Sequence, residues 1–336
     1  MRGCGCRDPR NSFMTASPVI SVMIPTYEPD DLLVQTVRAV LAQTSGRGSS
    51  QPAIEITVVD DASPTVDVAA LVSRADPDGR VELVRNSQQL GLAGNWNRAI
   101  GLARGDWIHL LHQDDYVLPN FYRRMGDGFW QRPDVGMAFC RTRIVDQADQ
   151  PLKTSSRVCW RKGVVSNWLL QIGERQRVQT PAVVVARRTY EQVGGFREDL
   201  CHALDWEMWV RIAAHYPVWY DPKVLAVYRR HACNESSRLL HSGKVWPDLA
   251  RAIAINARTF PAAIRDRLME RSTRWYAQSA LRTATKQLRA GDIVGAQKTL
   301  YHVPRLLELI RESRSTPALA RRAGAIEHRL RLLRAA

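Results

Sequence analysis

The sequence predicts an α/β protein with a mostly parallel central sheet, followed by a basic α-helical region. Short apolar, β-branched runs alternate with segments of helical periodicity up to about residue 235, which is typical of a parallel sheet covered by helices. Three of the apolar runs end in polar residues, at PTYE, DDAS and HQDD. After Ser236 the periodicity is helical and predicts no further strand.

Length and composition indicate an ordinary soluble globular protein of one or two domains. The chain has 336 residues, 45% apolar and 24% charged. No run approaches the roughly 18 apolar residues that a membrane-spanning helix needs. Residues 1–17 have no apolar core of the kind a secretory signal has, so we expect a disordered leader, with Met14 as an alternative start. We predict a catalytic domain at 18–235 and a helical region at 236–336.

The first part of the predicted domain alternates regularly. Strands are expected at 19–27, 54–63, 80–86 and 107–115, separated by helices at 30–44, 66–75 and 95–105. Further strands are expected at 135–146, 181–188 and 224–231, with helices at 167–175 and 205–217. In the C-terminal region, LRAGDIVGAQKTL predicts a helix–turn–helix in which Gly291 makes the turn and Asp292 caps the second helix.

Charge is concentrated at the C-terminal end. The net charge is +15, and from Ser236 onward 20 Lys and Arg stand against 7 Asp and Glu, a net +13. Such a region suits an anionic membrane face or an acidic partner, and equally a solvated helical surface, because charge alone does not choose. Sparse aromatic residues with no stacking pattern argue against nucleic acid. The cysteines are few and widely spread, which favours a reducing, cytoplasmic compartment.

Two adjacent aspartates, Asp114 and Asp115, end the predicted strand at 107–115. Neighbouring carboxylates repel, so we expect a positive partner there, such as Mg²⁺ or Mn²⁺ bridging to an anionic ligand. The alternative is a turn with a helix cap, which is common for Asp before Pro. His231, at the end of the last predicted strand, is a candidate third ligand, although a lone histidine there is more often structural.

A second pair, Asp60 and Asp61, ends another predicted strand. One of these carboxylates is a candidate acceptor of hydrogen bonds from a nucleobase or ribose. Pro25, Thr26 and Tyr27 offer backbone groups and a flat ring to a base, although PTY is also a plain strand-to-turn sequence. Glycine-rich phosphate-binding motifs are absent from the sequence.

Asp205 opens a predicted helix in DWEMWVRIAAHYP. It is interpreted either as a helix cap or as a general base, with Glu207 as the neighbouring alternative. The flanking Trp206 and Trp209 would form an apolar wall that raises the pKa of the carboxyl group.

Taken in order, these segments resemble glycosyltransferase family 2. The resemblance rests on SVMIPTYEPDDLLVQTVRAVLAQT, EITVVDDASPT, NSQQLGLAGNWNRAIGLARGDWIHLLHQDD, GGFREDLCHALDWEMWVRI and YRRH, which together run from about Val19 to His231. It implies a GT-A fold and transfer of a sugar, with inversion, from a nucleotide diphosphate donor to an acceptor hydroxyl. The expected acceptor is a glycan or a lipid-linked saccharide in cell-surface polysaccharide synthesis. The expected location is the cytoplasm, with peripheral contact at the inner face of the membrane.

The resemblance also implies roles for individual residues. Pro25, Tyr27, Asp61 and Asp114 would hold the nucleotide. Asp114, Asp115 and His231 would hold Mg²⁺ or Mn²⁺, and Asp205 would be the catalytic base. His112 stands where the family's metal motif usually has its first aspartate, which weakens the case for metal dependence. Two alternatives are a nucleotidyltransferase, which would want a basic glycine-rich loop, and a non-catalytic scaffold that binds nucleotide sugars.

Overall fold

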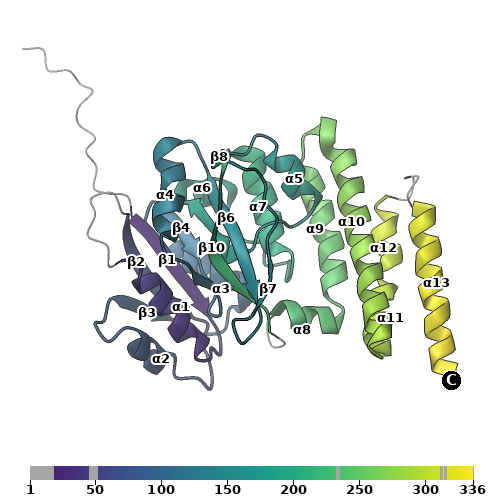
Figure 1. Cartoon of the computed structure of the whole chain (residues 1–336), viewed down its shortest axis with the longest axis horizontal. Coiled ribbons are helices and arrows are strands. Elements are labelled where there is room, and N and C mark those ends of the chain that lie inside the picture. Colours follow the sequence, from purple (N-terminus) through teal and green to yellow (C-terminus); the bar gives the residue numbers. More distant parts are fainter. Residues whose placement is uncertain (1–18, 45–51, 232–234, 311–312, 314–315, 336) are drawn as a thin grey trace, which may run out of the picture.

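The computed structural model describes residues 19–44, 52–231, 235–310, 313 and 316–335. The expected leader at 1–17, with Met14, lies outside these ranges. A ten-stranded sheet with its helices forms one end of the molecule, and a stack of helices from the C-terminal part of the chain forms the other (Figure 1).

The strands are β1 (Val19–Thr26), β2 (Ala53–Asp60), β3 (Val81–Arg85), β4 (Trp107–Leu110), β5 (Tyr116–Val117), β6 (Met137–Val145), β7 (Pro151–Thr154), β8 (Gly163–Val164), β9 (Val183–Ala186) and β10 (Val218–Arg229). They pair in the order β3-β2-β1-β4-β9-β6-β10-β5, with β7 beside β6 and β8 beside β10. Pairs among β3, β2, β1 and β4, and the pair of β6 with β10, are parallel. β9, β5, β7 and β8 pair antiparallel to their neighbours, so the sheet is mixed around a parallel centre.

The helices are α1 (Leu32–Leu41), α2 (Val68–Ala75), α3 (Gly91–Leu102), α4 (Phe121–Gln131), α5 (Trp168–Glu174), α6 (Arg187–Val193), α7 (Leu204–His215), α8 (Glu235–Ser242), α9 (Val245–Thr259), α10 (Ala262–Arg289), α11 (Ile293–Tyr301), α12 (Val303–Glu308) and α13 (Thr316–Ala335), with a short 3₁₀ helix at Thr180–Ala182. α3 packs on β1, β2 and β4, and α4 packs on β6 and β10. Within the described ranges, none of these helices is long and apolar enough to traverse a lipid bilayer.

Most predicted elements are confirmed, with differences at their ends. The strand predicted at 107–115 ends at Leu110, and the strand predicted at 224–231 begins earlier, at Val218. β5, β7, β8, α4 and α6 had not been predicted, because they are short or carry few apolar residues in a regular period. The predicted turn at Gly291 has φ +77°, and the Asp292 side chain accepts the N–H of Gly295 at 2.8 Å.

The parallel register brings the carboxyl ends of several strands to one edge. Thr26 at the end of β1 pairs with Asp60 at the end of β2, which pairs with Arg85 at the end of β3. Farther along the same sheet, Val145 of β6 pairs with Arg229 of β10. Residues that immediately follow these strands therefore meet at that edge, where ligands bind in open α/β sheets.

The C-terminal helices pack on the sheet-bearing part through α9 and α10, which contact α7 and α5. One continuous hydrophobic cluster runs from Ile20 in β1 to Leu330 in α13. Leu306 and Leu307, which lie between basic residues of the C-terminal region, are buried in this cluster. They therefore pack inside the protein and are not available to a membrane surface. The division into domains at 235/236 remains a prediction.

We predict that the contact between α5 and the start of α10 contributes to the unfolding free energy of the protein. Phe260, just before α10, is 3% exposed, and its ring lies 3.0 Å from the position that a Cβ at Gly173 would take. Phe260→Ala is expected to cost about 3–5 kcal/mol of unfolding free energy. Gly173→Ala should destabilise the wild-type protein and should cost less beside Phe260→Ala, because the conflict with the Phe260 ring is then gone while the contact with Leu268 at 3.1 Å remains. The measurement is chemical denaturation of all four forms; additive effects would contradict the contact.

Candidate active site

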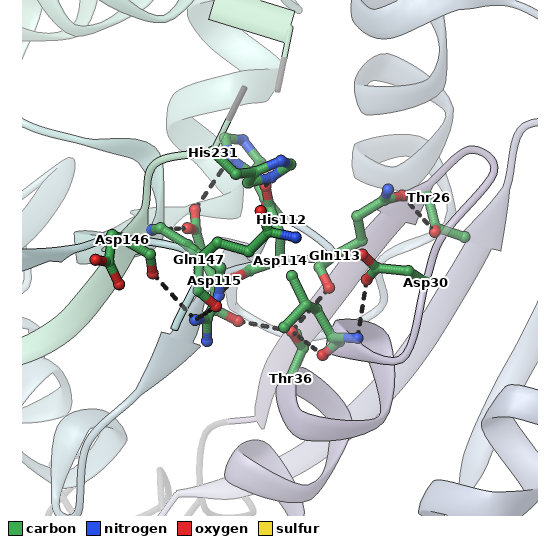
Figure 2. A network of polar contacts seen from close by, with 12 residues as sticks. Thr26, Asp30, Thr36, His112, Gln113, Asp114, Asp115, Asp146, Gln147 and His231 are labelled. Carbon is green, nitrogen blue, oxygen red and sulfur yellow. Dashed lines mark hydrogen bonds and ion pairs between the residues drawn. The ribbon is translucent and has the colours of Figure 1, made fainter. Parts of the chain in front are cut away.

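The carboxyl edge of the sheet gathers side chains from five segments. Figure 2 shows Thr26, Thr36, the residues 112–115, the turn at Asp146 and His231 drawn together there. Residues 112–115, which we call the HQDD segment, follow β4 after Leu111. They leave the strand geometry because their polar groups bond to neighbouring loops instead of continuing the ladder.

Gln113 anchors the HQDD segment to the end of β1. Its Oε1 accepts the hydroxyl of Thr26 at 2.6 Å and the backbone N–H of Tyr27 at 2.8 Å, and its Nε2 donates to the carbonyl of Tyr27 at 3.2 Å. The hydroxyl of Thr36 on α1 lies 3.0 and 2.7 Å from the carbonyl oxygens of Gln113 and Asp115. The two aspartates are therefore held on a fixed backbone.

Asp115 is fully buried at this edge. Its Oδ1 accepts the backbone N–H of Arg229 at 2.8 Å, and its Oδ2 lies 3.2 Å from Nδ1 of His112. Burial and the neighbouring charge of Asp114 raise the pKa of Asp115 to about 6. Burial opposes the charged form of His112, but the hydrogen bond and charge of Asp115, with the charges of Asp114 and Asp205, raise its pKa overall.

Asp114 has its own cationic partner. Nε2 of His231, just beyond β10, donates to Oδ2 of Asp114 at 2.8 Å. This hydrogen bond raises the pKa of His231. Each of the two adjacent carboxylates is thus paired with a histidine, one from its own segment and one from the far end of the domain.

Arg229 is the residue of this site that the sequence did not reveal. Its side chain is 1% exposed. Its guanidinium donates to oxygens on three segments: the carbonyls of Asp114 (3.1 Å), Asp146 (3.4 Å) and Gln147 (3.2 Å), and Oε1 of Gln35 (2.7 Å). It also pairs with Asp149 at 3.0 Å. A signal was present in YRRH, since a charged residue inside an otherwise apolar final strand needs buried partners.

The residues of the HQDD segment fit a divalent cation. Ligand atoms of His112, Asp114 and Asp115 lie within 4.8 Å of one another. In the described part of the chain, the buried Nε2 of His112 has no hydrogen-bond partner, and the buried Oδ2 of Asp115 faces only Nδ1 of His112, at 3.2 Å. Carboxylate oxygens with one imidazole suit Mg²⁺ or Mn²⁺. His231 is bonded to Asp114 and lies outside that group of three.

The predicted nucleotide residues lie along the neighbouring strand ends. Tyr27 is 41% exposed, while Pro25 is buried within β1. Asp61 is buried, and its carboxylate accepts the amide of Asn86 (2.9 Å) and the backbone N–H groups of Leu90 (2.8 Å) and Gly91 (2.9 Å). Asp61 thus holds the start of α3. Its Oδ2 accepts one of these bonds, which leaves acceptor capacity for a further donor.

Asp205 lies in the first turn of α7 but does not cap it. The N-cap position is Ala203, and no side chain of the helix itself caps there, so the capping interpretation of Asp205 is wrong. Burial raises the pKa of Asp205 to about 6. Hydrogen bonds from the backbone N–H of Trp206 and from the amide of Gln176, which donates to Oδ2 at 2.7 Å, act in the opposite direction and lower it. Its charge also contributes to the raised pKa of His112 in the HQDD segment.

The neighbours of Asp205 have structural partners. Glu207 is buried and forms a two-bond ion pair with Arg211, at 2.9 and 2.7 Å. Arg211 in turn donates to the carbonyls of Val193 (2.5 Å) and Gly195 (2.9 Å), so Glu207 fixes the turn at Gly194, where φ is +84°. Glu207 is therefore engaged in holding this loop, unlike Asp205.

Two C-terminal helices support the segment that carries Asp205. Asp248 of α9 accepts the backbone N–H groups of Cys201 (3.0 Å), His202 (2.8 Å) and Ala203 (2.8 Å), and so fixes the backbone that leads into α7. The hydroxyl of Tyr276 on α10 accepts the backbone N–H of Gln176 at 3.0 Å. Neither support was predicted, because both partners lie far apart in the sequence.

A family model described as glycosyl transferase family 2 matches residues 21–200. The chain belongs to this family. The glycosyltransferase prediction is confirmed, and family membership favours it over the nucleotidyltransferase and scaffold alternatives. An uncharacterised protein of Mycobacterium tuberculosis is 30% identical over 240 residues, 68% of this chain and 72% of that protein.

Other relatives of the family 2 chain act in polysaccharide synthesis. The succinoglycan biosynthesis protein ExoO of Rhizobium meliloti is 35% identical over 108 residues, which is 32% of this chain and 29% of ExoO. Chondroitin synthase of Escherichia coli is 22% identical over 228 residues, 66% of this chain and 30% of the synthase. The chain thus spans about a third of the length of these two relatives.

Solved structures confirm the GT-A fold. TarS 1–349 of S. aureus, in complex with UDP-GlcNAc, superposes with a TM-score of 0.64 at 16% identity, covering 93% of this chain and 88% of that one. The mannosyltransferase PcManGT of Pyrobaculum calidifontis, in complex with GDP-Man and Mn²⁺, gives 0.55 at 18% identity, covering 93% and 81%.

We predict that Asp115→Asn separates metal binding from folding. The folded pKa of Asp115, about 6, lies above the ordinary 3.8, so its stabilising contribution is present at low pH and is lost as the pH rises through 6. At pH 7.5 in chelator, Asp115→Asn should therefore be more stable than wild type, by on the order of 1 kcal/mol.

Added Mn²⁺ should raise the melting temperature of the wild type and of Asp266→Asn, an exposed acid on α10, but not of Asp115→Asn. Differential scanning fluorimetry measures both effects. Equal Mn²⁺ stabilisation of all three proteins would contradict the site.

Proposed function

We propose that this glycosyltransferase is inverting and metal-dependent, and that Asp205 is its catalytic base. The observation that carries the proposal is the buried carboxylate of Asp205, whose pKa of about 6 suits proton transfer near neutrality and whose charge helps to raise the pKa of His112 in the HQDD segment. A base of this pKa is largely ionised at pH 7 and still basic enough to take a proton as an acceptor hydroxyl attacks.

The nucleotide diphosphate donor is proposed to lie along the ends of β1, β2 and β4. Tyr27 offers an exposed ring, and Pro25, Asp61 and Asp114 border the same edge. Asp114, Asp115 and His231 would hold Mg²⁺ or Mn²⁺, with His112 as a ligand that the structure adds. When bound, the ion supplies charge neutralisation for the departing nucleotide diphosphate. UDP-GlcNAc and GDP-Man, seen in the solved relatives, are the first donors to test.

The chain's own residues would act in one displacement. Gln176 fixes the orientation of Asp205 so that one carboxylate oxygen faces the acceptor hydroxyl. The acceptor oxygen attacks the anomeric carbon from the side opposite the nucleotide, its proton passes to Asp205, and the bond to the diphosphate breaks. No covalent sugar–enzyme intermediate forms, so the anomeric configuration is inverted.

The proposed setting is polysaccharide synthesis at the inner face of a membrane. ExoO and chondroitin synthase support a glycan or lipid-linked saccharide as acceptor. Because Leu306 and Leu307 are buried, contact with a membrane would rest on the arginines of the helical region and would weaken with salt.

We predict that Asp205→Asn lowers turnover by roughly two to four orders of magnitude, because the amide is nearly isosteric but takes no proton. Donor affinity should stay within about twofold of wild type, since Asp205 acts on the acceptor. The assay is sugar transfer or donor hydrolysis with a panel of sugar nucleotides and Mn²⁺. An equal loss of donor affinity and rate would assign Asp205 to binding instead.

We predict that Gln176→Met shifts the pH dependence of turnover. The Gln176 amide stabilises the charged form of Asp205, so its loss should raise the pKa of Asp205 above about 6. The acid limb of the kcat profile should move up by about one pH unit, the size expected for one hydrogen bond to a charged group. Glu207→Gln is the control, because Glu207 is bound to Arg211 and its loss should leave the limb unmoved.

A further inference from the structure

Four arginines and one tryptophan form a basic cluster where α10 meets the segment after α5. Its members are Arg175, Arg177, Arg271, Arg282 and Trp275. The guanidinium of Arg175 lies 3.7 Å from the ring centroid of Trp275, and that of Arg282 lies 5.4 Å from it. Burial and the charges of Arg175 and Arg271 lower the pKa of Arg177, so both of these guanidinium groups repel that of Arg177.

The charge of this cluster is largely uncompensated. Among the described residues, Glu174 is the acid that forms an ion pair with the cluster, 3.6 Å from Arg177. Across the ranges that the structure describes, Arg175, Arg271 and Arg282 form no ion pair with Asp or Glu. Arg175, Arg177 and Arg271 are also partly buried, so solvent screens them less than it screens ordinary surface arginines. A fold that keeps like charges together in this way leaves a position for an anion.

The cluster adjoins the proposed base. Gln176, which bonds to Asp205, stands between Arg175 and Arg177 in the chain. Tyr276, which follows Trp275, accepts the backbone N–H of Gln176, and its pKa responds to both Asp205 and Arg175. Gln176 and Tyr276 thus connect the cluster to Asp205, and an acceptor long enough to extend past them from Asp205 would approach these arginines.

We propose that the basic cluster is an acceptor subsite for phosphate, so that the acceptor is a phosphate-bearing glycan or polyol. This inference rests on the proposed role of Asp205. Planar guanidinium groups bind phosphate through paired N–H donors, and stacking on Trp275 fixes the orientation of Arg175. Neutral saccharide acceptors would gain nothing from such a site, which makes the cluster a determinant of acceptor class.

Phosphate binding is best measured on full-length protein in chelator, where the proposed metal site holds no cation and repels anions. Phosphorus NMR titration with glycerol 1-phosphate is the probe, and neutral glycerol is followed by proton NMR as the comparison. We expect Arg175→Gln with Arg271→Gln to weaken glycerol phosphate binding at least about tenfold, as expected for lost charge-assisted hydrogen bonds. Arg321→Gln with Arg322→Gln, two exposed positions on α13, removes the same charge and should stay within about twofold of wild type.

Arg175→Lys keeps the positive charge but loses the planar pair of N–H donors, so its affinity for glycerol phosphate should be intermediate. This variant provides the test if the double variant folds poorly. Equal weakening in both double variants, or in neither, would overturn the subsite.

Sedimentation with phosphatidylglycerol vesicles separates an acceptor from a membrane surface. Vesicle binding that depends on Arg175 and Arg271 but not on α13 would overturn the acceptor assignment, because the phosphate would then belong to a lipid surface. Asp205→Asn should bind glycerol phosphate like wild type. If Asp205→Asn also keeps full turnover, the proposed base fails while the phosphate result stands on its own.

Discussion

The buried guanidinium of Arg229 holds the functional edge of the sheet together. It reaches the carbonyl that precedes Asp115, the turn at Asp146 and the side chain of Gln35 on α1, while its own backbone N–H binds Asp115. A buried guanidinium charge is costly unless it is hydrogen-bonded, and these backbone and side-chain oxygens supply the acceptors. The positions of both aspartates therefore depend on a residue at the end of the last strand.

Sequence patterns predicted the parallel part of the fold because its strands are apolar, β-branched and separated by helices of regular period. They also predicted that Asp61, Asp114, Asp115 and His231 would lie at the carboxyl edge of the sheet, and these residues follow the ends of β2, β4 and β10 there. They failed where structure depends on distant partners. The predicted strand at 107–115 stops at Leu110 because Gln113 bonds to Thr26 and Tyr27 instead of continuing the sheet.

Site prediction had the same limit. The type and spacing of Asp205 singled it out. Arg211, four residues after Glu207 on the same helix, was a local signal that Glu207 is paired, but Gln176, which holds Asp205, lies 29 residues away in the sequence. Trp206 and Trp209 were expected to form an apolar wall beside Asp205. Both rings are instead buried in the core, and the Trp206 indole donates to the carbonyl of Ile172. The raised pKa of Asp205 comes from burial of the carboxyl group itself.

The hydrogen bonds from residues 201–203 to Asp248 also matter for interpreting natural sequence variants of this chain. The family match ends at residue 200, before Asp205, Asp248 and Tyr276. A genome survey that scores only the matched span would count a chain with a frameshift after it, or with a substitution at Asp248, as an intact enzyme. In this protein the boundary of the recognisable family and the boundary of the working unit do not coincide, and a search for functional relatives has to extend through α10.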